Sequence, residues 1–329
     1  MAMFRVATAV VCCLASVGAL ATTAEATSGS STGTDVDRVV TLGDSFSSGS
    51  GIHRDASSFD DHGPEAHAFD RVTRLGSSAC QRELDETPGP RLAGLLGAES
   101  VVVACAGALI SEIPAQVRAA AIHGDGAGTL ITVTIGGNDL RTGRDENWPD
   151  ALVRCIASPG CHRSALNRAA NLDEIRRELT DAYVAIGAEF PDVTVRALGY
   201  PRLMQSDRWC AGVTGVSRAE ADFVDDQVDE LNRQIDLAAA VARARTGADI
   251  RYVSVVDVFD GHGACRFWQR DRYVNDLVFG DTVRRRRLGD GSIREVRDDG
   301  PLNVSTASFH PSRRGYDAYL EALRGSVAP

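Results

Sequence analysis

Runs of β-branched and apolar residues alternate along this chain with helical patterns, and this alternation restricts the fold more than any other feature. Two long helical patterns cover residues 172–190, which end before Pro191, and residues 218–245, which end near Gly247. Strands that alternate with helices form a parallel sheet covered on both faces. The sequence therefore predicts an α/β fold with a parallel central sheet, whose strands are residues 36–42, 99–104, 130–135, 193–198 and 250–258.

Two stretches interrupt the alternation. Residues 50–80 contain three histidines without periodicity, which predicts a long loop beside the end of the first strand. Residues 269–300 contain four consecutive arginines and a Gly-Asp-Gly turn, which predicts an exposed hairpin before the last helix. We expect both stretches to wall a pocket at the sheet edge, and we interpret the arginine run, residues 284–287, as solvated rather than lipid-binding.

The first 26 residues have the features of a signal peptide. One positive charge precedes a run of small apolar residues, and Ala24-Glu25-Ala26 has the form that a signal peptidase cleaves. A membrane anchor is the alternative, but the run is rich in Ala, Thr and Ser, and a flexible tether over residues 27–35 follows it. We therefore expect a secreted, extracellular protein without stable membrane insertion, in which residues 36–329 form a single domain.

Beyond residue 26 the number of cysteines is even, which in an exported protein predicts disulfide bonds. They are Cys80, Cys105, Cys155, Cys161, Cys210 and Cys265. The sequence does not choose among the possible connectivities, and sequential pairing is the simplest because each closed loop stays local. A zinc site would need paired C-x2-C or H-x3-H spacing; neither spacing occurs in the sequence, so we expect no metal.

Charge and composition bear on the class of partner. The chain has 35 basic and 45 acidic residues, a net charge of −10, and every basic residue is arginine. An acidic chain without a dense basic stripe lacks the phosphate contacts that nucleic-acid binding needs. The low aromatic content, 6%, weakly favours acyl chains over stacked sugars as ligands. No heptad or interface pattern appears, so we expect a monomer.

Residues 43–49, Gly-Asp-Ser-Phe-Ser-Ser-Gly, follow the first predicted strand. A serine at a strand-to-helix turn places its hydroxyl at the carboxyl edge of the sheet, where an adjacent base can activate it as a nucleophile. An ordinary helix N-cap is the alternative for Ser45, because serine and aspartate are common there.

Two further motifs follow the second and third predicted strands. Gly107 offers an unobstructed backbone N–H, and Asn138 offers a side-chain amide at the same sheet edge. Together with the N–H of Ser45 they can form an oxyanion hole, although each taken singly is also explained as a turn or cap residue. We expect Asp44 and Asp139 to brace their loops rather than to act on a substrate.

His310 precedes Pro311 at the start of the terminal helical pattern, an extended and partly exposed position from which it can reach Ser45 as a general base. The other histidines lie in the long loop or beside glycine or cysteine, and we expect them to be solvated or structural. They are His53, His62, His67, His123, His162 and His262.

Four ordered blocks resemble those of the SGNH, or GDSL, hydrolases: residues 43–49, Gly107, residues 136–139 (Gly-Gly-Asn-Asp) and His310-Pro311. The cysteine frame, the Ala-Cys-Ala-Gly-Ala segment around Gly107 and the motifs at 199–201 and 261–265 resemble, more narrowly, the secreted actinobacterial esterases and lipases of that superfamily. The resemblance covers residues 36–326.

This resemblance implies a flavodoxin-like three-layer α/β/α fold and ester hydrolysis without a cofactor. It assigns Ser45 as nucleophile, His310 as general base and then general acid, and donors of Ser45, Gly107 and Asn138 as the oxyanion hole. It also implies the sequential disulfide pairing.

One position departs from the family pattern. Many members carry an aspartate three residues before the histidine, and here that residue is Ala307. In the narrower secreted group a main-chain carbonyl orients the histidine, and we expect the Ala307 carbonyl to do so, with Ser308 as the second choice. A carbonyl can fix the imidazole tautomer, as a carboxylate does. No spacing argument supports a distant carboxylate such as Asp260.

The sequence therefore predicts a secreted serine esterase or lipase that hydrolyses small-molecule or lipid esters through an acyl-enzyme on Ser45. A phospholipase or a carbohydrate acetyl esterase on the same fold is the alternative, and a non-catalytic cell-surface binding module is a distant one. Tyr200, Trp209, Phe267 and Trp268 are candidates for an apolar slot, although core or loop packing is the favoured interpretation for each.

Overall fold

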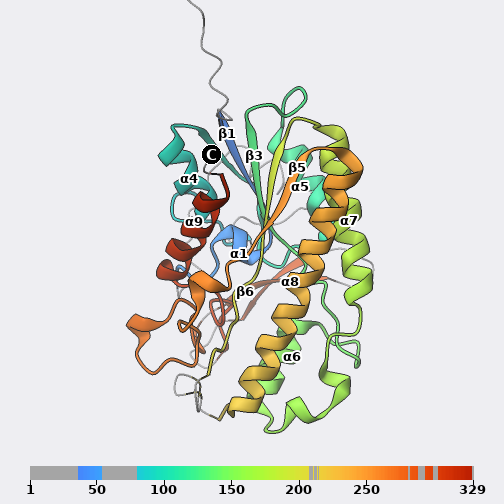
Figure 1. Cartoon of the computed structure of the whole chain (residues 1–329). Helices are drawn as coiled ribbons and strands as arrows, with labels where there is room; N and C mark the ends of the chain where they lie inside the picture. The colour runs from blue at the N-terminus through green and yellow to red at the C-terminus, as the bar shows by residue number, and fades with distance from the viewer. Residues whose placement is uncertain are drawn as a thin grey trace, which may run out of the picture. The chain divides into compact units, whose positions relative to one another are not determined.

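Five strands pair into one parallel sheet in the described part of the chain (Figure 1). The computed structural model describes residues 36–53, 80–206, 210, 213, 215–280, 282–287, 293–298 and 303–327. The strands are β1 (Arg38–Gly43), β2 (Glu99–Val102), β3 (Thr129–Thr134), β4 (Thr194–Leu198) and β5 (Asp249–Val253). Their order across the sheet is β2-β1-β3-β4-β5, which is the flavodoxin-like order. The predicted parallel sheet is confirmed.

Helices cover both faces of this sheet (Figure 1). On one face α4 (Pro88–Leu96) packs against α9 (Arg313–Val327). The other face carries α5 (Ile113–Ala120), α7 (Leu172–Glu189) and α8 (Arg218–Thr246). The three-layer α/β/α architecture that the family resemblance implies is therefore present.

The longest helix, α8, begins and ends at clear sequence signals. Ser217 and Glu220 form a capping box, in which the Ser217 N–H donates to the Glu220 carboxylate at 2.8 Å and the Glu220 N–H to the Ser217 hydroxyl at 3.3 Å. The helix ends at Gly247, whose φ of 79° lies in the left-handed region. Its first turns extend beyond the carboxyl edge of the sheet toward α6 (Trp148–Ala157) (Figure 1).

The core lies between the sheet and these helices. All six residues of β3 are buried, and the β-branched and aliphatic side chains of β1 are fully buried as well. Each buried Val, Leu or Ile side chain among them stabilises the fold by roughly 1.5–3 kcal/mol. These strands therefore form a rigid base under the loops that follow their carboxyl ends.

The insertion before the last helix forms the predicted hairpin: β6 (Thr282–Arg287) pairs antiparallel with β7 (Ile293–Asp298). The remaining short elements are α1 (Ser45–Ser48) and the 3-10 turns η2 (Ile110–Glu112), η3 (Cys161–Arg163), η4 (Ala165–Asn167), η5 (Asp257–Phe259) and η6 (Gln269–Asp271). The last predicted strand was expected to reach residue 258, but β5 ends at Val253.

Three disulfide bonds join Cys80 to Cys105, Cys155 to Cys161 and Cys210 to Cys265, which confirms the sequential pairing. The predicted signal peptide, the tether and residues 54–79 of the long loop lie outside the described residues. Within those described, no helix is both long and apolar enough to cross a membrane.

Candidate active site

The site lies at the carboxyl ends of β1 and β3, which pair side by side where the strand order reverses. β1 ends at Gly43, whose φ is 118°, and a Cβ there would lie 2.2 Å from the Thr134 carbonyl oxygen, so only glycine fits. Asp44 then caps α1 by accepting the Phe46 N–H at 2.9 Å. This turn places Ser45 at the sheet edge.

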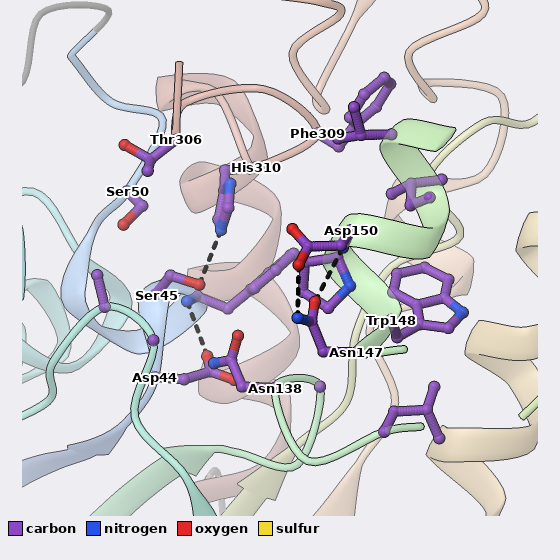
Figure 2. A pocket seen from close by; sticks show the side chains of 18 of the residues that line it. Asp44, Ser45, Ser50, Asn138, Asn147, Trp148, Asp150, Thr306, Phe309 and His310 are labelled. Carbon is purple, nitrogen blue, oxygen red and sulfur yellow. Dashed lines mark hydrogen bonds between the residues drawn. The ribbon is translucent and has the colours of Figure 1, made fainter. Parts of the chain in front are cut away.

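Ser45 and His310 meet at this edge although they lie 265 positions apart in the chain (Figure 2). The Ser45 hydroxyl oxygen is 2.7 Å from Nε2 of His310. The Phe46 ring packs beside the imidazole, with ring centroids 4.9 Å apart. This is the contact that a serine nucleophile and its base require.

The carbonyl that orients His310 belongs to Ser308, and the prediction of Ala307 was wrong. Ser308 O lies 3.0 Å from Nδ1 of the ring. Ala307 O instead accepts the side-chain amide of Asn275 at 3.2 Å and the backbone N–H of His310 at 3.4 Å. Phe309 explains the difference, because its φ of 59° turns the chain so that the carbonyl of residue 308 faces the ring.

Burial keeps the His310 imidazole neutral. It lowers the pKa of His310 from the ordinary value of 6.5 to about 4, and hydrogen bonding to the backbone of Ser308 and, less, of Thr306 opposes the shift only in part. None of the described carboxylates, including Asp260, contacts the ring. At neutral pH, Nδ1–H therefore donates to Ser308, and Nε2 can accept a proton from Ser45.

Gly107 and Asn138 line the same cavity as Ser45. Gly107 has a φ of 73°, and the Cys80–Cys105 bridge holds its segment. The Asn138 side chain donates from Nδ2 to the Ala108 carbonyl at 3.1 Å, which fixes the amide beside the Gly107 loop. The predicted donor residues are thus brought to one place.

Asp44 and Asp139 both bind backbone N–H groups, as predicted for loop-bracing residues. Besides capping α1, Asp44 accepts the Tyr200 hydroxyl at 2.5 Å, and Asp139 accepts the Ile110 N–H at 3.1 Å. Burial raises the pKa of each carboxyl to about 7.

Tyr200 has a role that the sequence reasoning missed. Its buried hydroxyl accepts the Gly137 N–H at 2.9 Å and donates to Asp44, so it ties the loop after β3 to the turn after β1. Its place at the end of β4, in Gly199-Tyr200-Pro201, was the available signal, because residues after parallel strands meet at one edge.

A cavity of about 1010 Å³ opens over Ser45 and His310. Its walls come from the loops at the sheet edge, from α6 and from residues 227–231 of α8. About half of the lining side chains are apolar, among them Leu109, Leu140, Trp148, Leu152, Val153, Leu203, Val228, Leu231, Val296, Val304 and Phe309. A cavity of this size and character suits an extended apolar ligand.

Both interrupting stretches contribute to this cavity, the long loop through Ser50 and the hairpin through Val296, as we expected for wall elements. The sequence reasoning missed α6. Its signal was an Asn147 N-cap followed by apolar residues at helical spacing.

The aromatic candidates for an apolar slot differ in whether they line the cavity. Tyr200 is buried and lines the cavity. Phe267 and Trp268 do not line it; they are exposed, at 61% and 57%, and pack edge to face against each other. Trp209 lies outside the described residues.

Known proteins resemble this chain in sequence and in fold. Lipase 2 of Streptomyces coelicolor is 29% identical over 301 residues, which cover 86% of this chain and 90% of that protein. The crystal structure of phospholipase A1 from Streptomyces albidoflavus NA297 matches with a TM-score of 0.59 and 24% identity, over 89% of this chain and 100% of that one. The extracellular lipase of Streptomyces rimosus gives a TM-score of 0.59 and 23% identity, over 88% and 99% of the two chains. These two structures share the fold described above.

The GDSL-like Lipase/Acylhydrolase family model matches residues 39–323. That range includes the Ser45 turn, the Gly107 and Asn138 loops and the His310 segment. The chain therefore belongs to the GDSL-like lipase/acylhydrolase family and is an ester hydrolase.

Proposed function

We propose that this enzyme cleaves carboxylic esters of medium or long acyl chains through an acyl-enzyme on Ser45. The observation that carries the proposal is the 2.7 Å contact between the Ser45 hydroxyl and Nε2 of His310 beside an apolar cavity. A serine hydroxyl is a weak nucleophile until an adjacent base takes its proton, and the neutral His310 ring is that base.

The reaction proceeds in two halves. His310 accepts the Ser45 proton while the oxygen attacks the ester carbonyl carbon, and it then passes the proton to the leaving alcohol as the ester bond breaks. A water molecule next gives a proton to His310 and attacks the acyl carbon; His310 returns that proton to the Ser45 oxygen as the bond between this oxygen and the acyl carbon breaks, which releases the acid and restores Ser45. Throughout, the Ser308 carbonyl accepts a hydrogen bond from Nδ1–H and keeps the ring in orientation.

Donors from Ser45, Gly107 and Asn138 hold the oxyanion in this mechanism. An amide nitrogen carries two hydrogens, and one of those on Asn138 binds the Ala108 carbonyl, which leaves the other for the substrate oxygen. Loss of one such donor slows acyl transfer by a factor on the order of 10²–10³.

The cavity favours an extended acyl chain over an acetyl group. An acetyl group would leave most of the apolar lining in contact with water, whereas a longer chain covers it and gains about 0.8 kcal/mol for each buried CH₂. A phospholipid is a second candidate, because the exposed Arg141 lines the cavity and can meet a phosphate.

We also propose that the enzyme is secreted after cleavage behind Ala26. Its three disulfide bonds support this, because such bonds persist in oxidising compartments. The extracellular lipase of Streptomyces rimosus has the same fold. Intact mass of the protein from culture medium should correspond to a chain that starts at Thr27; full-length protein retained in the cells would overturn the proposal.

The decisive experiment combines turnover with active-site labelling. Hydrolysis of p-nitrophenyl esters of increasing acyl length is measured for the parent, Ser45→Ala and His310→Ala, and each protein is treated with a fluorophosphonate and weighed intact. Ser100→Ala, a change at an exposed serine outside the cavity, is the matched control.

We expect a single adduct and turnover in the parent and in Ser100→Ala, and neither in Ser45→Ala. Rates should rise from acetyl to longer esters. Turnover that survives in Ser45→Ala would overturn the nucleophile assignment, and folded parent protein without adduct or turnover would favour a binding module. Release of fatty acid from phosphatidylcholine vesicles but not from p-nitrophenyl esters would favour the phospholipase.

A further inference from the structure

The loop that carries His310 has a conformation that it does not favour by itself. Phe309, directly before the histidine, has a φ of 59° and a buried side chain. A bulky residue in the left-handed region raises the free energy of the folded chain by about 1–3 kcal/mol and persists only where surrounding structure fixes it. The orientation of His310 depends on this turn, so the contacts that fix the turn are of functional interest.

Asn275 supplies three of these contacts. Its Nδ2 donates to the Gly51 carbonyl at 2.9 Å and to the Ala307 carbonyl at 3.2 Å. Its backbone N–H donates to the His310 carbonyl at 2.9 Å. Gly51 lies six residues after Ser45, so one buried side-chain amide joins the Ser45 segment to the His310 loop.

The two segments that Asn275 joins are in close contact. A Cβ at Gly51 would lie 2.7 Å from the His310 Cβ and 2.6 Å from the Pro311 carbonyl oxygen. A small displacement of one segment therefore moves His310 relative to Ser45. Asn275 itself does not line the cavity over Ser45; it lines a smaller hollow of about 250 Å³.

Gln81 makes a second tie between the same segments. The Ser50 hydroxyl donates to Oε1 of Gln81 at 2.7 Å, and Nε2 of Gln81 donates to the Thr306 hydroxyl at 2.6 Å. Figure 2 shows Ser50 and Thr306 next to each other beside His310. Gln81 is 1% exposed, so water does not compete for these hydrogen bonds.

We propose that Asn275 is a positioning residue for ester hydrolysis: it holds the His310 loop against the Ser45 segment, and Gln81 is the second tie. The inference rests on the proposed function, because it requires His310 to act on Ser45. Asn275 acts through the histidine and touches neither the substrate nor the reacting atoms. Its effect belongs in the rates of acylation and deacylation and not in substrate binding.

The test is Asn275→Ala together with Asn275→Asp, which keeps the size of the side chain but turns an oxygen toward the two carbonyls. Misplacement of a reacting group by about 1 Å can slow a reaction about 10²-fold. We therefore expect kcat to fall about 10–100-fold with KM little changed, and fluorophosphonate labelling to slow by the same factor. The acid limb of kcat/KM should also move up toward pH 6.5, because a loosened loop admits water to the ring.

Asn167→Ala is the matched control. Asn167 is also buried and donates from its side chain to the Cys161 carbonyl at 2.7 Å, but it contacts neither Ser45 nor His310. The Asn167→Ala substitution should lower the melting temperature and leave both kcat and the acid limb of kcat/KM unchanged. Gln81→Ala removes only the second tie and provides the same readouts if a variant at position 275 does not fold.

Variants at positions 275 and 81 that fold and keep the parental kcat and acid limb overturn the inference. The inference is also overturned if these variants lose no more kcat than an Asn167→Ala protein whose melting temperature has fallen by the same amount. His310→Ala separates this failure from that of the proposed function. If His310→Ala stays active, the mechanism itself is wrong, whereas an inactive His310→Ala beside fully active variants at 275 and 81 refutes only the positioning role.

Discussion

Acidification tests the state of the proposed base directly. Burial lowers the pKa of His310 to about 4, whereas an exposed histidine titrates near 6.5. Only the neutral ring can accept the Ser45 proton, so kcat/KM should rise as the pH increases through the pKa of His310 and stay level above it. Burial therefore extends the active range on the acid side.

The size of the effect follows from the shift. At pH 5, a pKa of about 4 leaves roughly nine-tenths of the rings neutral, whereas a pKa of 6.5 would leave roughly 3% neutral. The two cases differ about 30-fold in kcat/KM at that pH. Such a difference is far larger than the error of a steady-state assay.

The assay measures ester hydrolysis from pH 3.5 to 8 by quenching samples and reading released p-nitrophenol under alkaline conditions, with circular dichroism to verify that the protein stays folded. Asp44→Asn is the control, because burial also places the pKa of the Asp44 carboxyl near 7. We expect the acid limb near pH 4 to remain in that variant. An acid limb with its midpoint at or above pH 6.5 in the folded parent protein would refute the reasoning. So would an acid limb whose midpoint shifts in Asp44→Asn.

Three further predictions concern the oxyanion donors, a disulfide and the cavity wall. Asn138→Ala should lower kcat by a factor on the order of 10²–10³ with the melting temperature unchanged, and a near-normal kcat would remove Asn138 from the oxyanion hole. Replacing Cys80 and Cys105 by serine should destabilise the fold by about 3 kcal/mol. Because that bridge holds the Gly107 segment, the replacement should also lower kcat at temperatures where the protein stays folded. Parental kcat in the folded variant would contradict this. Leu152→Trp should narrow the cavity and shift the preferred ester toward shorter acyl chains, which competition between esters of two lengths would measure.

The strands and long helices could be predicted because local sequence determines them. β-branched runs bounded by turn residues gave four strands to within about two residues, and Pro191 and Gly247 marked the ends of α7 and α8. The fifth strand was predicted too long for a physical reason. Valines continue at positions 255, 256 and 258, and Val255 is fully buried, but the chain has already left the sheet and turns into η5. An apolar run reports burial, not hydrogen bonding to a neighbouring strand.

Ser45, Gly107, Asn138 and His310 could be located because each follows or precedes a recognisable element. The orienting carbonyl could not, because it depends on the left-handed backbone of Phe309, which aromatic residues rarely adopt and no sequence signal announces. The role of Asn275 could not be predicted either, since its side-chain partner Gly51 lies 224 positions away. Hydrogen bonds between such distant segments are a property of the assembled fold.

The position of the two proposed catalytic residues in the chain has a consequence for the order in which the enzyme is completed during synthesis. Ser45 precedes all six bridged cysteines, and His310 follows all of them. Each bridge joins neighbours in the cysteine order, so every one can close before the next pair has emerged. A nascent chain can thus complete its covalent framework, all five strands of the parallel sheet and the start of its cavity while it still lacks its base. On the proposed mechanism, hydrolysis therefore begins only when the final segment has been added and folded.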